Sequence, residues 1–128
     1  MRRRLLYILL SLNLLCAVGF TSPGATAPPG KPKVVEVVVR EFEIVPKEIA
    51  VKPGEVLFVV RNTGAIEHDF AIEDAAAKSV ARIAVIPPGK QEELRVALRP
   101  GLYTVLCTLP GHKDAGMKGM LNVQDSSS

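Results

Sequence analysis

A chain of 128 residues has room for one domain of ordinary size and little more. Its formal net charge is +3, from 16 Lys and Arg against 13 Asp and Glu. Arg2, Arg3 and Arg4 account for the whole excess, so the rest of the chain is close to neutral. This balance argues against nucleic acid or another polyanion as a partner.

The N-terminal residues 1–20 have the pattern of a secretory signal peptide. The three arginines form a basic region, and an apolar run follows from residue 5 to residue 20. The run is short for a membrane span of ~20 apolar residues, and Ser11 and Asn13 interrupt it. We therefore predict a signal peptide and an exported protein, in the periplasm or another extracytoplasmic space. An uncleaved anchor that tethers the domain to a membrane is the alternative.

Residues 21–33 are rich in Pro, Gly and small residues and are predicted to form a flexible linker. The remaining residues, 34–128, contain short segments rich in β-branched residues, separated by Gly and Pro turns. The predicted strands are 34–42, 48–51, 55–62, 68–74, 78–86, 93–99, 102–107 and 120–123. Three consecutive alanines at 75–77 leave a helical turn open as an alternative there. About eight strands at this spacing predict an all-β sandwich or barrel.

In the predicted strand 68–74, successive side chains alternate between two faces, and His68, Phe70 and Ile72 share one of them. An inward-facing histidine at the start of a strand costs desolvation free energy unless it has a partner. A structural hydrogen bond would satisfy the ring, and a metal ion would do so equally well.

The chain has two cysteines, Cys16 and Cys107. Cys16 lies within the predicted signal peptide, so the exported domain cannot form an internal disulfide. Cys107 lies in phase with Tyr103 and Val105 at the end of a predicted strand, and its side chain should point inward. Its thiol is therefore either buried and inert or committed to chemistry.

His112 and Met117 follow Cys107 at intervals of five, in the loop between the last two predicted strands. Singly, a buried cysteine, a solvated histidine and a core methionine are ordinary features. Together with His68, however, they supply two imidazoles, a thiolate and a thioether, which is the ligand set of a blue-copper site. Two alternatives are a metal-free interaction module, in which this spacing is accidental, and a catalytic Cys–His pair.

The segment GLYTVLCTLPGHKDAGMKGMLNV, residues 101–123, resembles the C-terminal copper loop of the cupredoxins, the family of plastocyanin, azurin and auracyanin. Four residues separate Cys107 from His112 and four separate His112 from Met117, and this spacing is most similar to auracyanin. PGH and MKG resemble azurin, and Gly-x-Tyr before the cysteine resembles plastocyanin. The resemblance covers nearly all of the chain from residue 34, although NTGAIEHDF matches only loosely. It implies a Greek-key all-β fold that binds one type 1 copper per chain.

Carried over by position, the resemblance implies that His68, Cys107 and His112 are the equatorial ligands. It implies that Met117 is the axial ligand. Met120 competes with Met117 for the axial role. If the last strand keeps Leu121 and Val123 inward, Met120 faces the other way, which favours Met117. Two departures from the family bear on redox tuning. Asp69 stands where an asparagine often ties the two ligand loops together, and Leu106 stands where an aromatic residue often precedes the cysteine.

The resemblance further implies a monomeric, non-enzymatic carrier that passes single electrons between transient redox partner proteins. His112 is then the exposed ligand, and its apolar neighbours form the docking surface; they are Leu109, Pro110, Ala115 and either Ala65 or Ile66. A copper-binding or copper-delivery protein without electron transfer is the alternative, because it would use the same ligands. A copper enzyme needs further histidines for a second metal, and the whole chain has two.

Overall fold

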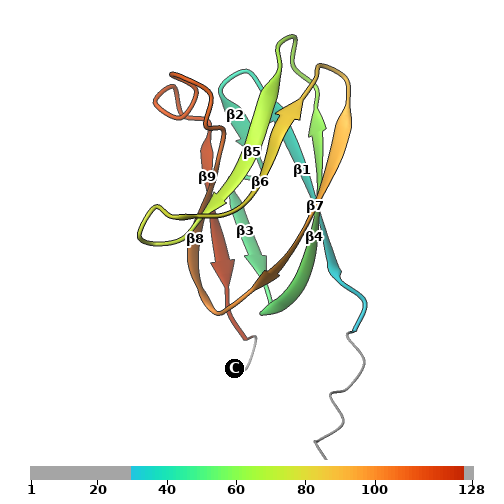
Figure 1. The fold of residues 1–128 in the computed structure, drawn as a ribbon, viewed down its shortest axis with the longest axis vertical. Coiled ribbons are helices and arrows are strands. Elements are labelled where there is room, and N and C mark those ends of the chain that lie inside the picture. The colour runs from blue at the N-terminus through green and yellow to red at the C-terminus, as the bar shows by residue number, and fades with distance from the viewer. Residues whose placement is uncertain (1–29, 126–128) are drawn as a thin grey trace, which may run out of the picture.

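The computed structural model describes residues 30–125, which form a sandwich of two β-sheets (Figure 1). The predicted signal peptide and most of the predicted linker lie outside the described residues, and both remain predictions. Between residues 30 and 125, no helix is long and apolar enough to cross a membrane.

The nine described strands are β1 (Lys33–Arg40), β2 (Glu43–Val45), β3 (Glu48–Val51), β4 (Gly54–Asn62), β5 (His68–Glu73), β6 (Ser79–Ile86), β7 (Gln91–Leu98), β8 (Gly101–Leu106) and β9 (Lys118–Val123). The predicted all-β fold class is confirmed. The strand not predicted is β2, which is only three residues long and pairs with β1. The alanine segment forms a turn between β5 and β6, in which the Asp74 carboxylate accepts hydrogen bonds from the backbone of Ala76 and Lys78.

The strand order is β2-β1-β4-β7 in one sheet and β3-β9-β8-β5-β6 in the other. The β1–β4 and β3–β9 pairs are parallel, and the other pairs are antiparallel. In the second sheet β5 runs antiparallel to β8, with Ala71 opposite Leu106. The start of β5 and the end of β8 therefore lie at the same end of the sandwich, opposite the C-terminus (Figure 1). This pairing places His68 near Cys107.

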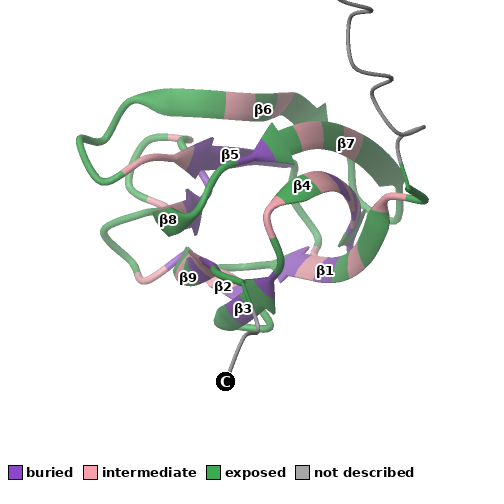
Figure 2. Cartoon of the chain, turned by 90° about the horizontal axis from the view of Figure 1, so that it is seen from below, coloured by how far each residue is buried: buried purple, intermediate pink, exposed green. Residues whose placement is uncertain are grey.

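The core lies between the two sheets and is built from the inward-facing residues of both (Figure 2). Phe58 of β4 and Phe70 of β5 meet across it, with ring centroids 5.7 Å apart. Strand β5 is buried on both faces, because Asp69 and Ala71 are covered as well as His68 and Phe70. Neither face of this strand is therefore a solvent-facing side.

Candidate metal centre

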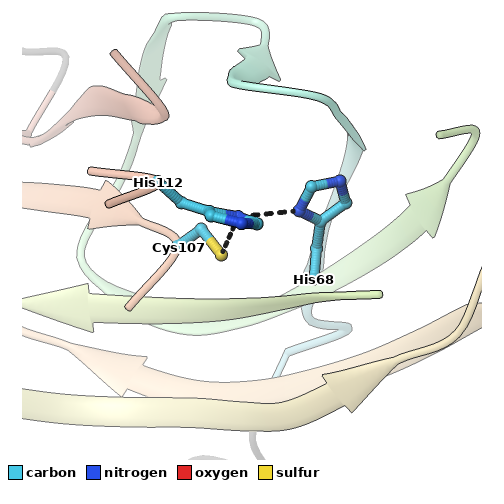
Figure 3. A group of neighbouring side chains, drawn as sticks. All are labelled: His68, Cys107 and His112. Carbon is cyan, nitrogen blue, oxygen red and sulfur yellow. Dashed lines mark hydrogen bonds between the residues drawn. The ribbon is translucent and has the colours of Figure 1, made fainter. Parts of the chain in front are cut away.

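Three of the predicted ligands come together at one end of the sandwich (Figure 3). His68 begins β5, Cys107 follows directly after β8, and His112 lies in the loop between β8 and β9. Their ligand atoms all lie within 4.8 Å of one another. Nδ1 of His112 is 3.3 Å from Nδ1 of His68 and 3.5 Å from Sγ of Cys107. Two nitrogens and one sulfur thus converge on a common point.

These three side chains differ in their access to solvent. His68 and Cys107 are fully buried, whereas His112 is partly exposed. Phe42, in the turn between β1 and β2, meets the His112 ring edge-on with centroids 5.5 Å apart. The surface is therefore reached through His112 and not through the other two residues.

Met117 is fully buried in the same loop. Its backbone N–H donates to the carbonyl of His112 at 3.0 Å, and its carbonyl accepts from the N–H of Cys107 at 3.1 Å. Met120, by contrast, is 52% exposed, whereas its neighbour Leu121 is buried. The predicted outward orientation of Met120 is thus confirmed, and of the two methionines Met117 is the one available from the interior.

Burial shifts the titration of two of these groups. It raises the pKa of the Cys107 thiol, and burial together with the neighbouring His112 lowers the pKa of His68. Both shifts favour the uncharged form of the side chain. A cation that binds here must therefore displace the thiol proton, so its binding is coupled to proton release.

Asp69 joins the strand of His68 to the loop of Cys107. Its buried carboxylate accepts a hydrogen bond from the backbone N–H of Thr108 at 2.6 Å and a second from the Thr108 hydroxyl. The guanidinium of Arg82 donates to the same carboxylate at 2.8 Å. A carboxylate therefore makes the connection expected of asparagine, and Arg82 balances its charge. Arg82 was not predicted, although the pairing of Ala71 with Arg82 brings it beside Asp69.

The turn between β4 and β5 is organised by Asn62, which was also not predicted. Its buried amide donates to the carbonyls of Ile66 and Ile86, both at 2.8 Å, and its Oδ1 accepts from the N–H of Gly64 at 2.8 Å. The Asn-Thr-Gly sequence is a local turn signal. The bond to Ile86 spans 24 residues, however, and no local pattern indicates it.

The family model described as the cupredoxin-like domain matches residues 9–123, so the chain belongs to the cupredoxin-like family. Its relatives include the copper-resistant cuproprotein CopI of Vibrio cholerae. The two are 32% identical over an alignment 119 residues long, and the match covers 78% of this chain and 68% of CopI.

Solved structures with the same fold include auracyanin from Roseiflexus castenholzii, determined in its dithionite-reduced form. It has a TM-score of 0.67 and 26% identity, covering 75% of this chain and 100% of auracyanin. Azurin from Methylomonas sp. strain J has a TM-score of 0.65 and 16% identity, over 73% of this chain and 98% of azurin. At that identity azurin supports the fold alone. The predicted resemblance to the cupredoxins is confirmed.

The donor set fits a type 1 copper site on its own chemistry. Copper in that site is held by two imidazoles, one thiolate and a weak axial thioether. His68, Cys107 and His112 supply the first three groups in one cluster, and Met117 places a buried thioether in the same loop. Zinc sites use Cys, His and carboxylate ligands, and a thioether is not among their usual donors.

Proposed function

We propose that this protein is a small blue-copper electron carrier, in which His68, Cys107, His112 and Met117 hold one copper ion. The observation that supports this most strongly is the convergence of two imidazole nitrogens and a thiol within 4.8 Å of one another. Bound copper supplies a one-electron Cu(I)/Cu(II) couple there.

The chain itself holds the donors in place and keeps solvent away from all of them except the partly exposed His112. Cys107 is tied through its backbone to Met117, and His68 begins a strand that is buried on both faces. Sulfur ligands suit Cu(I), and imidazole also suits the oxidised metal. A rigid set of both kinds is therefore a compromise that serves either oxidation state with little movement.

The partly exposed His112 is the proposed route for electrons. The ring of Phe42, which is 47% exposed, meets His112 edge-on, and Ile66, which is 44% exposed, lies in the turn just before His68. The resemblance predicted the loop residues and either Ala65 or Ile66, whereas Phe42 was not predicted. A small apolar patch of this kind suits brief encounters with partner proteins, which belong to the low end of interface sizes.

Electron self-exchange tests this proposal without a known partner. In a mixture of Cu(I) and Cu(II) protein, NMR line broadening should report fast exchange. Ile66→Lys should slow that exchange while leaving the absorption spectrum unchanged. Leu102→Lys is the matched control, because Leu102 is 58% exposed at the start of β8, at the other end of the sandwich. Slow exchange in the unaltered protein, or equal rates in both variants, would contradict the proposal.

A second candidate function is copper handling in resistance, favoured by the 32% identity to CopI. It uses the same four ligands, so geometry does not separate the two functions. A handling protein should give up Cu(I) rapidly to a competing chelator, whereas a carrier should retain it through repeated oxidation and reduction. Under either function we propose a protein without catalytic activity, since both histidines of the chain are committed to this one site. We propose in addition that it is a monomer.

We also propose that the domain works outside the cytoplasm. The support is the pattern of residues 1–20, with three arginines ahead of an apolar run. The mass of the protein recovered after expression in a bacterium measures this. Loss of an N-terminal segment is the expected result, and the intact mass in a membrane fraction would indicate a retained anchor.

A further inference from the structure

The ring of His68 has a second nitrogen, which the ligand cluster does not use. Its Nδ1 faces His112, whereas its Nε2 is buried and has no hydrogen-bond partner among the described residues. When Nδ1 binds a metal, Nε2 carries the ring proton and becomes a donor. A buried donor without an acceptor is costly, and metal-bound histidines almost always donate this N–H to a carboxylate, a carbonyl or water.

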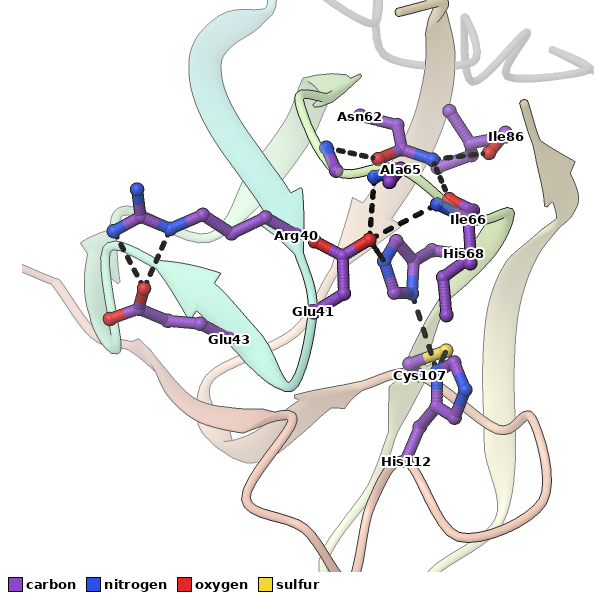
Figure 4. A network of polar contacts seen from close by, with 11 residues as sticks. Arg40, Glu41, Glu43, Asn62, Ala65, Ile66, His68, Ile86, Cys107 and His112 are labelled. Carbon is purple, nitrogen blue, oxygen red and sulfur yellow. Dashed lines mark hydrogen bonds and ion pairs between the residues drawn. The ribbon is translucent and has the colours of Figure 1, made fainter. Parts of the chain in front are cut away.

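The carboxylate of Glu41 lies beside this nitrogen, with Oε1 3.9 Å from Nε2 of His68 (Figure 4). The same oxygen accepts hydrogen bonds from the backbone N–H groups of Ala65 at 2.6 Å and Ile66 at 3.0 Å. These bonds fix the carboxylate against the turn that precedes His68. The backbone N–H of Glu41 itself, followed by these two bonds, lowers the pKa of the Glu41 carboxyl.

The turn provides space for this carboxylate. A Cβ atom at position 64 would lie 2.5 Å from Oε1 and 2.7 Å from Oε2 of Glu41, so a side chain there would displace the carboxylate. Gly64 therefore leaves room for the acid between the β1–β2 turn and the strand that begins with His68. The β1–β2 turn and the turn before His68, which are distant in sequence, therefore pack against each other at this point.

We propose that Glu41 is a positioning residue of the metal centre, whose carboxylate accepts the hydrogen bond from Nε2–H of His68. The inference rests on the proposed copper site. A movement of about 1 Å converts the present contact into a hydrogen bond. The bond holds the ring in the tautomer whose Nδ1 is free to bind the metal. The negative charge makes that nitrogen more basic and therefore a stronger metal ligand. Glu41 thereby stabilises Cu(II) relative to Cu(I).

The test is Glu41→Gln, which keeps an oxygen for Ala65 and Ile66 but removes the charge. Relative to the unaltered protein, we expect a higher reduction potential and a Cu(II) affinity lower by about 10-fold or more. The melting temperature of the metal-free protein should stay the same. Glu43→Gln is the matched control, since Glu43 is a nearby carboxylate paired with Arg40 instead of a histidine. It should change neither quantity.

A second readout follows the proton itself. In the diamagnetic Cu(I) protein, NMR should show a slowly exchanging Nε2–H on His68 that loses its protection in Glu41→Ala, which removes the acceptor oxygen. If Glu41→Gln matches Glu43→Gln in potential and affinity, and Glu41→Ala leaves the His68 proton protected, this inference is overturned while the copper site stands. If the unaltered protein takes up no copper, the proposed function fails and this inference fails with it.

Discussion

The two segments that supply the proposed ligands depend to different degrees on the rest of the fold. The loop between β8 and β9 supplies Cys107, His112 and Met117, and its own backbone hydrogen bonds join these three residues. The turn between β4 and β5 leads into one ligand, His68, which is the first residue of β5. Its shape depends on Asn62, which contacts Ile86 across 24 residues. The first segment is therefore specified locally, and the second is specified by tertiary contacts.

Asp69 connects these two unequal segments. It follows His68 in the chain and accepts a hydrogen bond from the backbone of Thr108, the residue after Cys107. The locally specified loop is thus attached to the strand whose position the whole sandwich determines. We therefore expect substitutions in the loop to affect mainly the chemistry of the metal centre. Substitutions in the turn should affect mainly the free energy of unfolding.

The largest effect on chemistry is expected for Cys107→Ser. Removal of the thiolate removes the sulfur-to-copper charge transfer, so the intense visible absorption should disappear completely. Visible spectroscopy with one equivalent of Cu(II) measures this. Retention of the band by the variant would mean that Cys107 is not a ligand.

Asn62→Ala is the substitution that should destabilise the turn between β4 and β5 most. The substitution leaves the carbonyls of Ile66 and Ile86 and the N–H of Gly64 without their buried partner. We expect the free energy of unfolding of the metal-free protein to fall by about 3 kcal/mol. Urea denaturation measures the change. Asn122→Ala is the control, because Asn122 is only partly buried at the far end of β9, and it should cost much less.

A smaller effect should separate the two methionines. Met117→Leu should raise the reduction potential while copper stays bound, because the axial ligand tunes the potential of such sites. Met120→Leu should leave the potential unchanged, since Met120 is exposed. Voltammetry of both variants measures this. If only Met120→Leu shifts the potential, the axial assignment is wrong.

The contrast between the two segments also explains what the sequence can predict. The spacing from Cys107 to Met117 lies within one loop, so the cluster and the family resemblance are visible in the sequence itself. The strand periodicity likewise predicts the all-β fold. Glu41 has no such signal, because it becomes relevant only once the turn after β1 packs against the turn before β5. Strand β2 is too short to have a periodicity.

The same limit applies to Asp69. Its position after the first histidine marks it in the sequence as a departure from the family. Its carboxylate nevertheless fills the connecting role, because β6 pairs with β5 and brings Arg82 to it. A single sequence shows the residue but not the compensating charge, which arrives through strand pairing.

The central claim is that His68, Cys107, His112 and Met117 form one type 1 copper site. The most direct measurement is the visible absorption spectrum of the domain, with its N-terminal segment removed, after addition of one equivalent of Cu(II). An intense blue or green band that saturates at one copper per chain is the expected result. A colourless protein, or a weak spectrum like that of copper bound by nitrogen and oxygen alone, would contradict it.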